Sequence, residues 1–317
     1  MVLTAVLVAA TGLTGCSKSA EVGDVFVTLQ GAGAVAKLGG QAWLAGALSQ
    51  YVDVTSKGDR LVLTSVGADK VFVIALSSGK ILKTIDVGRI PQGVKISPDD
   101  RLALVAIEGE GMLAFIELTN YTIFATIPVG RQPHNIVYSR DGSLAYVTLQ
   151  QDDEVVVIDI ARRAVTGRIA LGDPGVPDGP HNLDLTPDGD TLFVSLRYSN
   201  QLAVIDLETN EVLTYVPLTE GHHGVDVSPI GRWVYVAGVG SPFVNVIDAH
   251  TFERVALIEA GPGPHGLRTS PDGKLLYVAL SQADQVAVID TTTRQVVDRI
   301  SFSDGAVPFW IAVIGNR

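Results

Sequence analysis

The sequence predicts an all-β protein, a seven-bladed β-propeller with four-stranded antiparallel blades. One composite blade is expected to be closed by strands from the N- and C-terminal ends. Three observations predict this fold. A unit of about 42 residues is copied along the chain, its hydrophobic positions keep constant spacings, and the two ends supply complementary parts of one further unit. Four-stranded repeats of roughly 40–45 residues are typical of propellers.

Six complete copies of the unit follow one another from residue 49. They begin at Ser49, Pro91, Pro133, Pro180, His222 and Pro264, so successive starts lie 42, 42, 47, 42 and 42 residues apart. The shared pattern is clearest in PHNLDLTPDGDTLFVS at Pro180 and PHGLRTSPDGKLLYVA at Pro264. Repeats of this length indicate that each copy is one supersecondary unit, which buries its hydrophobic faces against its neighbours.

Each copy is predicted to contain four short strands, as the copy at Pro180 illustrates. Its first strand, 182–186, runs into a Pro-Asp-Gly turn, in which proline presets one backbone angle and glycine tolerates the angles that end the turn. The second, third and fourth strands are predicted at 192–196, 202–206 and 212–216. Their nearly continuous aliphatic and β-branched residues indicate strands that are covered on both faces.

The register of the strands can be checked from the spacing of hydrophobic anchors. First- and second-strand anchors lie 11 residues apart in every copy, as do Val52 and Leu63, and second- and third-strand anchors lie 8 apart, as do Leu63 and Val71. The N-terminal segment keeps the second spacing, because Val27 and Val35 are also 8 apart. This segment therefore contains the second and third strands of a blade that lacks its own first strand.

The C-terminal end supplies the missing strand. Residues 308–313 have the form of a first strand, so we expect them to pair with the N-terminal segment and to close the ring, which removes open sheet edges. From Val35 to the next anchor, Val52, there are 17 residues where 23 are usual. The outer strand of this composite blade, near 41–46, is therefore expected to be short or missing.

Two short motifs recur in the copies. Tyr-Val-Thr or Tyr-Val-Ala stands at 146–148, 235–237 and 277–279, and Val-Ile-Asp stands at 157–159, 204–206, 246–248 and 288–290. Together they resemble the YVTN-type propeller repeat of secreted bacterial and archaeal proteins, over everything after about residue 24. The resemblance implies the fold and leaves the activity open, because propellers carry many unrelated functions.

Composition excludes several classes of function. The net charge is −11, from 34 acidic and 23 basic residues, and no basic stripe with interleaved aromatic residues occurs, so we expect no nucleic-acid binding. No apolar run approaches the roughly 20 residues that a membrane-spanning helix needs. The single cysteine cannot form an internal disulfide or a thiolate metal cage.

That cysteine, Cys16, follows a short apolar stretch and ends the run Leu-Thr-Gly-Cys, which resembles the bacterial lipobox. The resemblance implies a signal peptide at 1–15, a lipidated tether at 16–23 that begins with acylated Cys16, and one propeller domain at 24–317. The protein is then exported and anchored in the cell envelope, at the periplasmic face or the cell surface, as a monomer whose partners are the membrane and, in one alternative, an envelope protein. The other interpretation of Cys16 is an ordinary buried cysteine in an N-terminal strand.

A candidate site is found by reading two positions ahead of each first-strand anchor. In a propeller the first strands line the central channel, so these seven residues are predicted at one mouth of it. They are Gln50, Gln92, His134, His181, His223, His265 and Phe309. Four of the protein's six histidines thus occupy one position in four consecutive blades. Glu108, Arg197 and the insertion 172–179 begin or form loops on the same face.

Neutral imidazoles are good ligands for copper and other transition metals, so His134, His181, His223 and His265 are candidate metal ligands. Gln50, Gln92 and Arg197 are candidate residues for ligand binding beside them. The arrangement is similar to the histidine ring that holds copper in the nitrous-oxide reductase propeller, and to the haem-binding propellers of dissimilatory nitrite reductases. No Cys-x-x-Cys-His is present, so a haem-type tetrapyrrole would be bound non-covalently. In the alternative interpretation, copying the unit copies a histidine that only bonds a neighbouring carbonyl.

Three functions stay open at this point. The first is a lipid-anchored envelope protein that binds a metal or a metal cofactor at the channel mouth. The second is a lactonase-like propeller hydrolase, in which Arg197, Glu108 and the histidines converge on a substrate. The third is a protein–protein interaction scaffold. We expect binding rather than catalysis and assign no catalytic residue. The charged run 152–154 is predicted to be a solvated loop tip.

Overall fold

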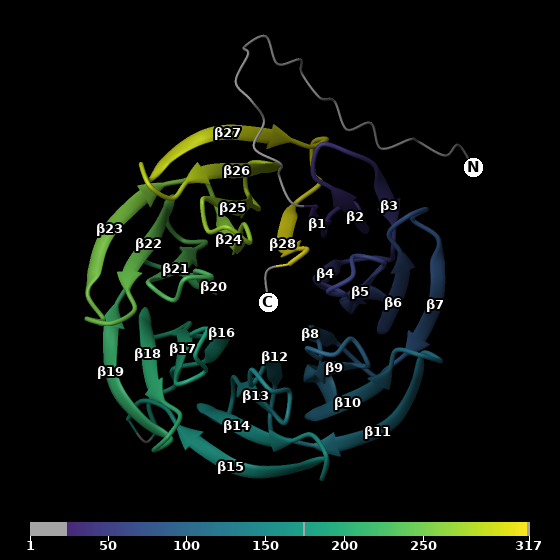
Figure 1. Cartoon of the computed structure of the whole chain (residues 1–317), viewed down its shortest axis with the longest axis horizontal. Coiled ribbons are helices and arrows are strands. Elements are labelled where there is room, and N and C mark those ends of the chain that lie inside the picture. Colours follow the sequence, from purple (N-terminus) through teal and green to yellow (C-terminus); the bar gives the residue numbers. More distant parts are fainter. Residues whose placement is uncertain (1–23, 174, 316–317) are drawn as a thin grey trace.

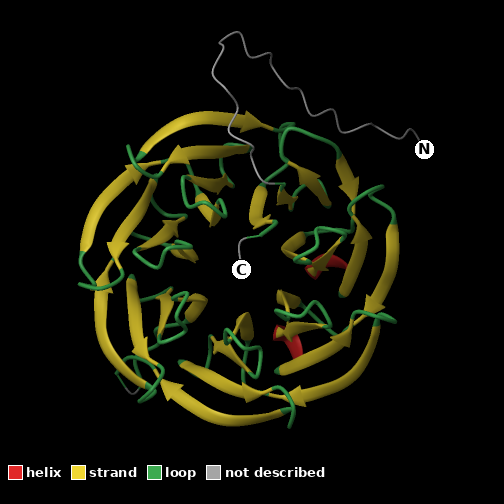
Figure 2. Ribbon diagram, in the orientation of Figure 1, coloured by secondary structure: helices red, strands yellow, loops and turns green. Residues whose placement is uncertain are grey.

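The computed structural model describes residues 24–173 and 175–315, which form seven four-stranded antiparallel sheets in a closed ring around a central channel (Figures 1 and 2). The predicted all-β, seven-bladed propeller is therefore confirmed. Two short 3₁₀ helices, Val66–Ala68 and Glu108–Glu110, interrupt the strands. The predicted signal peptide, the tether and Cys16 lie outside the described residues.

We number the blades from residue 49 and call the last one the composite blade. Blades 1 to 3 contain β4 (Ser49–Val54), β5 (Arg60–Ser65), β6 (Lys70–Ala75), β7 (Ile81–Asp86), β8 (Pro91–Ile96), β9 (Leu102–Ile107), β10 (Met112–Glu117), β11 (Thr122–Pro128), β12 (Pro133–Tyr138), β13 (Leu144–Leu149), β14 (Glu154–Asp159) and β15 (Ala164–Ala170). Blades 4 to 6 contain β16 (Pro180–Leu185), β17 (Thr191–Leu196), β18 (Gln201–Asp206), β19 (Glu211–Pro217), β20 (His222–Val227), β21 (Trp233–Gly238), β22 (Phe243–Asp248), β23 (Arg254–Glu259), β24 (Pro264–Thr269), β25 (Leu275–Leu280), β26 (Gln285–Asp290) and β27 (Gln295–Ser301).

The composite blade closes the ring as the sequence predicts. Its strand order is β28 (Pro308–Val313), β1 (Val25–Leu29), β2 (Ala34–Lys37) and β3 (Ala42–Leu44). The pairing of β28 with β1 places Ile311 opposite Val27. The outer strand β3 has only three residues, whereas the outer strands of the other blades have six or seven. The innermost strand of every blade contacts those of both neighbours, so the channel wall is continuous (Figure 1).

The predicted register is also confirmed. The first- and second-strand anchors are directly opposite partners in all six complete blades, for example Val52 with Leu63 and Leu183 with Val194. Hydrophobic side chains fill the spaces between blades, and most of them are completely buried. Within residues 24–173 and 175–315, no helix has the length and hydrophobicity that crossing a membrane requires.

The first strands begin earlier than predicted. β16 starts at Pro180 rather than at residue 182, because Pro180 pairs with Leu196 across an irregularity that ends at Leu183. Each of the seven innermost strands has such a break in register between the same two positions of the repeat. The predicted mouth residues therefore lie inside the strands, at a bulge, and not just before them. A bulge re-aims the side chains that it carries.

The bulges are of two kinds, which differ in the residue at the bulge and in the second-strand residue beside it. In blades 1, 3 and 4 and the composite blade, a second-strand Ser or Thr hydroxyl accepts the bulged N–H, at 2.9–3.2 Å. In blades 2, 5 and 6 that second-strand residue is alanine and the bulged residue is glycine. A Cβ on Gly266 would lie 2.5 Å from the Phe309 carbonyl oxygen of the next blade. Only glycine permits this approach where the hydroxyl is missing.

Candidate functional site

The residues predicted at the channel mouth occupy the bulges of the seven innermost strands, and we call this set the histidine mouth. Its members are Gln50, Gln92, His134, His181, His223, His265 and Phe309. The imidazoles of His134, His181 and His265 are only 4–5 % exposed, so they line the channel just inside its rim. His223 belongs to β20, and its side chain lies outside the part of the structure that is described.

Neighbouring members of the histidine mouth stack on one another around the rim. The ring centroids of His134 and His181 are 3.8 Å apart, and those of His265 and Phe309 are also 3.8 Å apart. Each of these pairs joins two adjacent blades. The imidazoles therefore contact their neighbours along the rim and make part of the interface between blades.

Two of the imidazoles are oriented by the backbone of the next blade. His134 Nδ1 lies 3.2 Å from the carbonyl oxygen of His181, and His265 Nδ1 lies 3.1 Å from that of Phe309. A carbonyl oxygen only accepts, so both rings carry their proton on Nδ1 and their lone pair on Nε2. Metal-binding histidines are commonly oriented by a bond of this kind, and so are histidines with a purely structural role.

His181 has the opposite arrangement. The side-chain amide of Asn182 donates to His181 Nδ1 at 2.8 Å, which places the ring proton on Nε2. Asn182 Oδ1 in turn accepts from the amide of Asn135. The two imidazoles that lie side by side therefore use Nδ1 differently, as a donor in His134 and as an acceptor in His181, so they do not offer equivalent ligand atoms.

An aromatic residue that sequence reasoning missed completes this part of the channel. The Tyr51 hydroxyl lies 3.4 Å from His134 Nε2, and its ring packs edge-on against that imidazole. Burial raises the pKa of Tyr51, so the hydroxyl stays protonated and can donate. Tyr51 also packs against Trp310, which holds the same repeat position in the composite blade. The aromatic residues that directly follow Gln50 and Phe309 were the signal that could have found both.

The structure also brings three predicted polar residues to this mouth. Gln92 Nε2 donates to Glu108 Oε2 at 2.6 Å. Burial raises the pKa of Glu108, while the bond from Gln92 and the positive charge of Arg197 oppose that rise. The charge of Arg197 likewise acts on the Tyr51 hydroxyl, although its own side chain is exposed. A carboxyl group and a guanidinium group therefore face the same channel mouth from different blades.

One acceptor at the mouth has no partner. Gln50 Oε1 is buried and makes no hydrogen bond with any described residue. Buried polar atoms are normally paired, so an orphaned one usually indicates water or a ligand. Among the residues whose placement is described, no group of three or more His, Cys, Asp or Glu side chains has a geometry that could hold a metal ion.

The prediction of a solvated charged tip at residues 152–154 is wrong. Asp153 Oδ1 accepts from the backbone N–H groups of Asp178 and Gly179, both at 2.9 Å, and so fixes the end of the insertion 172–179. Asp152 pairs with both the backbone N–H and the side chain of Arg131. Asp153 therefore joins blade 3 to the chain that enters blade 4, whereas Asp152 bonds to the chain that enters its own blade.

A second set of polar residues lies further along the channel, toward its opposite mouth, and sequence reasoning did not assign it. These residues stand one position after the first-strand anchors, and we call them the charge layer. They are Asp53, Lys95, Asp184, Asp226 and Arg268. Arg268 Nη1 donates to Asp226 at 2.8 Å and to Asp184 at 3.1 Å. Burial raises the pKa of Asp226, and the charge of Arg268 opposes this. The constant spacing of these charged residues was a sufficient signal.

Comparison with protein families finds one match, to the cytochrome D1 heme domain, over residues 186–308. That span is less than half of the chain, and the family consists of eight-bladed propellers, whereas this chain has seven blades. No curated protein matches the sequence.

Solved structures with the same fold include hydrazine synthase from Kuenenia stuttgartiensis. It is 18 % identical with a TM-score of 0.76, and the match covers 95 % of this chain and 94 % of that one. A functionally unknown protein from Desulfotomaculum acetoxidans DSM 771 is also 18 % identical, with a TM-score of 0.79 and coverage of 93 % and 100 %. At this level of identity both similarities establish the propeller fold alone.

Proposed function

We propose that this protein is a propeller binding protein of the cell envelope, anchored through Cys16, whose histidine mouth binds a haem-type tetrapyrrole non-covalently. The observation that carries the proposal is the orientation of His134 and His265. Their Nδ1 atoms bond to backbone carbonyls, so each ring has its lone pair on Nε2. In His134 that nitrogen faces the Tyr51 hydroxyl, which iron would have to replace. The similarity of residues 186–308 to a haem domain supports the same class of ligand.

The donor set fits such a group. A tetrapyrrole supplies four nitrogen ligands of its own and needs only one or two imidazoles, so neighbouring histidines with unlike tautomers are compatible with it. His134 or His265 would hold the iron, and Arg197 would pair with a carboxylate side group. The orphaned Gln50 Oε1 is a further acceptor for a polar edge.

The test is a spectroscopic titration of the purified mature protein with haemin. We expect saturable binding with a shifted Soret band, and at least tenfold weaker binding for the double variant His134→Ala, His265→Ala. His250→Ala is the matched control, because His250 lies in a turn after β22, where its backbone N–H bonds to Asp248, and not at the mouth. Copper and zinc, offered separately and followed by elemental analysis, test whether the histidines bind a bare metal instead.

The proposal is overturned if haemin causes no saturable spectral change, or if the double variant and His250→Ala bind equally well. Tight retention of copper or zinc in the absence of haemin binding would also overturn it. The lipid anchor has its own test: incorporation of labelled palmitate that is lost in Cys16→Ser.

A lactonase-like hydrolase is the second candidate, and the meeting of Glu108, Gln92 and Arg197 at the histidine mouth favours it. A carboxyl group with a raised pKa can act as a general acid, and a guanidinium group can bind a carbonyl oxygen. This candidate requires turnover of at least one lactone in a panel, and a large rate loss in His181→Ala. Without turnover it is excluded.

A further inference from the structure

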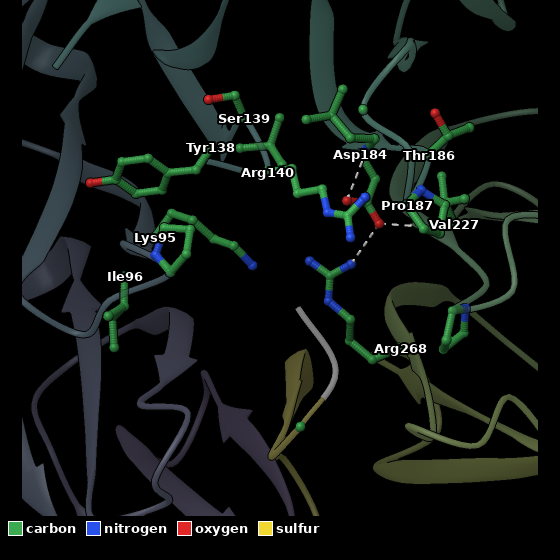
Figure 3. A pocket seen from close by; sticks show the side chains of 16 residues that line it. Lys95, Ile96, Tyr138, Ser139, Arg140, Asp184, Thr186, Pro187, Val227 and Arg268 are labelled. Carbon is green, nitrogen blue, oxygen red and sulfur yellow. Dashed lines mark hydrogen bonds and ion pairs between the residues drawn. The ribbon is translucent and has the colours of Figure 1, made fainter. Parts of the chain in front are cut away.

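A cavity of about 240 Å³ opens at the channel mouth opposite the histidine mouth. Figure 3 shows the side chains that line it. Turns between first and second strands line it, together with Lys95, Asp184 and Arg268 of the charge layer. Its walls are largely apolar and include Ile96, Val137, Pro187, Val227 and Pro229. Its polar side chains include Lys95, Arg140, Asp184 and Arg268. We call this cavity the basic pocket, because Lys95, Arg140 and Arg268 line it.

The carboxylates of the charge layer are committed to holding the blades together. Asp53 Oδ2 accepts from the backbone N–H of Ile96 at 2.8 Å, Asp184 Oδ2 from that of Val227 at 2.9 Å, and Asp226 Oδ2 from that of Thr269 at 2.8 Å. Each bond joins one blade to the next at the same repeat position. One oxygen of each carboxylate is therefore bonded to the channel wall, and Asp184 and Asp226 also accept from Arg268.

Three cationic side chains reach the same space, and one of them, Arg268, also bonds to Asp184 and Asp226. In Figure 3 the long side chains of Lys95, Arg140 and Arg268 extend from three different blades and end over the same central space. Both hydrogen bonds of Arg268 to described residues use Nη1, so Nε and Nη2 remain for a ligand. Arg140 makes no hydrogen bond or ion pair within the described part of the chain. Lys95 forms an ion pair with Asp53 Oδ2 at 3.8 Å.

We propose that the basic pocket binds a small organic carboxylate. Arg140 and Arg268 would hold the carboxylate group by charge-assisted hydrogen bonds, with Lys95 as a third positive charge. The apolar walls would cover the rest of the molecule, which favours an organic anion over sulfate or phosphate. The cavity is smaller than sites for drug-sized ligands, so it selects small acids. This site is independent of the proposed tetrapyrrole site.

The test is isothermal titration calorimetry of the full chain at constant ionic strength, with phenylacetate, succinate and inorganic sulfate as probes. We expect at least one of the two carboxylates to bind with a dissociation constant of roughly 1 mM or tighter. Sulfate should bind more weakly. Arg140→Gln should weaken carboxylate binding by about tenfold or more, because a charge-assisted hydrogen bond is lost.

Arg101→Gln is the matched control. Arg101 occupies the corresponding turn of the neighbouring blade, and its side chain is exposed beside Asp99 and does not line the pocket. Both arginines are exposed, so neither substitution should affect folding, and unchanged thermal unfolding confirms this. The proposal is overturned if neither carboxylate binds, if sulfate binds as tightly as the carboxylates, or if the two variants bind alike.

Discussion

At the scale of single residues, Glu108 shows how burial changes the pKa of a carboxyl group at the histidine mouth. The carboxyl group is half-buried, and burial raises its pKa despite the bond from Gln92 and the charge of Arg197. The folded protein therefore holds this proton more tightly than the unfolded chain does. The free energy of unfolding therefore falls as the pH rises from the pKa of Glu108 in the unfolded chain to its higher pKa in the folded protein. Above the higher pKa it does not fall further from this cause.

Glu108→Gln removes this pH-dependent loss while it keeps an acceptor for Gln92. We expect the variant to unfold at a higher temperature than the parent at pH 7, by no more than about 3 °C. Below about pH 4 the difference should vanish, since Glu108 is then protonated in both states. Thermal unfolding across this pH range is the measurement.

Glu110→Gln is the control for that prediction. Glu110 belongs to the same 3₁₀ helix, but its carboxylate accepts from the backbone N–H of Arg89 at 3.0 Å on an exposed surface. This variant should not gain stability at pH 7. Should Glu108→Gln prove less stable than the parent at pH 7, the attraction of Arg197 outweighs burial, and the assigned sign is wrong.

At the scale of strands, the bulge in each first strand connects the histidine mouth to the stability of the blade. Thr148 shows the mechanism: its hydroxyl accepts from the bulged N–H of Asn135 at 3.0 Å and donates to the carbonyl of His181 at 2.8 Å. The same carbonyl also receives His134 Nδ1. A second-strand hydroxyl therefore fixes the backbone that orients an imidazole of the site.

Replacing Thr148 by valine keeps the shape of the side chain and leaves two buried backbone groups without this partner. We expect Thr148→Val to lower the free energy of unfolding by about 1–3 kcal/mol. Thr148→Ser keeps the hydroxyl and should cost clearly less. Urea unfolding of the two variants measures the difference, and equal losses would show that packing of the methyl group, not the hydroxyl, supports the bulge.

At the scale of the whole molecule, stability depends on the pairing of β28 with β1, which joins the two ends of the chain. The central residues of this pairing, Val27 and Ile311, are opposite partners and completely buried. Through this pairing the side chains of the composite blade, like those of the six complete blades, fill the hydrophobic spaces between neighbouring blades. An open ring would expose both strand edges.

A disulfide across this junction tests the closure directly. In a Cys16→Ser background, Val27→Cys with Ile311→Cys should crosslink under mild oxidation within one chain, which a change in gel mobility detects. By closing a very long loop, the bond should stabilise the protein by about 2–4 kcal/mol against urea. Val27→Cys with Leu267→Cys, whose strands are not paired, should crosslink poorly. Equal crosslinking of the two pairs would contradict the closure.

Much of the site could be predicted because the repeat fixes the position of each side chain. His134, His181 and His265 lie at one mouth, as their common spacing from the anchors indicates. Tyr51 was missed because it follows the mouth residue Gln50, and only the bulge brings the side chain at that next position to His134. The hydrogen bond between Arg268 and Asp184 was missed because it joins blades 4 and 6, and the two residues are 84 positions apart in sequence.

The sequence alone determined the number of blades, the register of their strands and the joining of the chain ends. These properties depend on hydrogen-bond ladders between segments of one repeat and on a hydrophobic period that recurs in every copy. The tertiary structure alone decided which copied side chains meet and which imidazole nitrogen holds its proton. It also decided that Arg268 bonds to Asp184 and Asp226, and that Lys95, Arg140 and Arg268 line one pocket. Those outcomes depend on distances across the channel and between blades, which closure of the ring and the bulges set together.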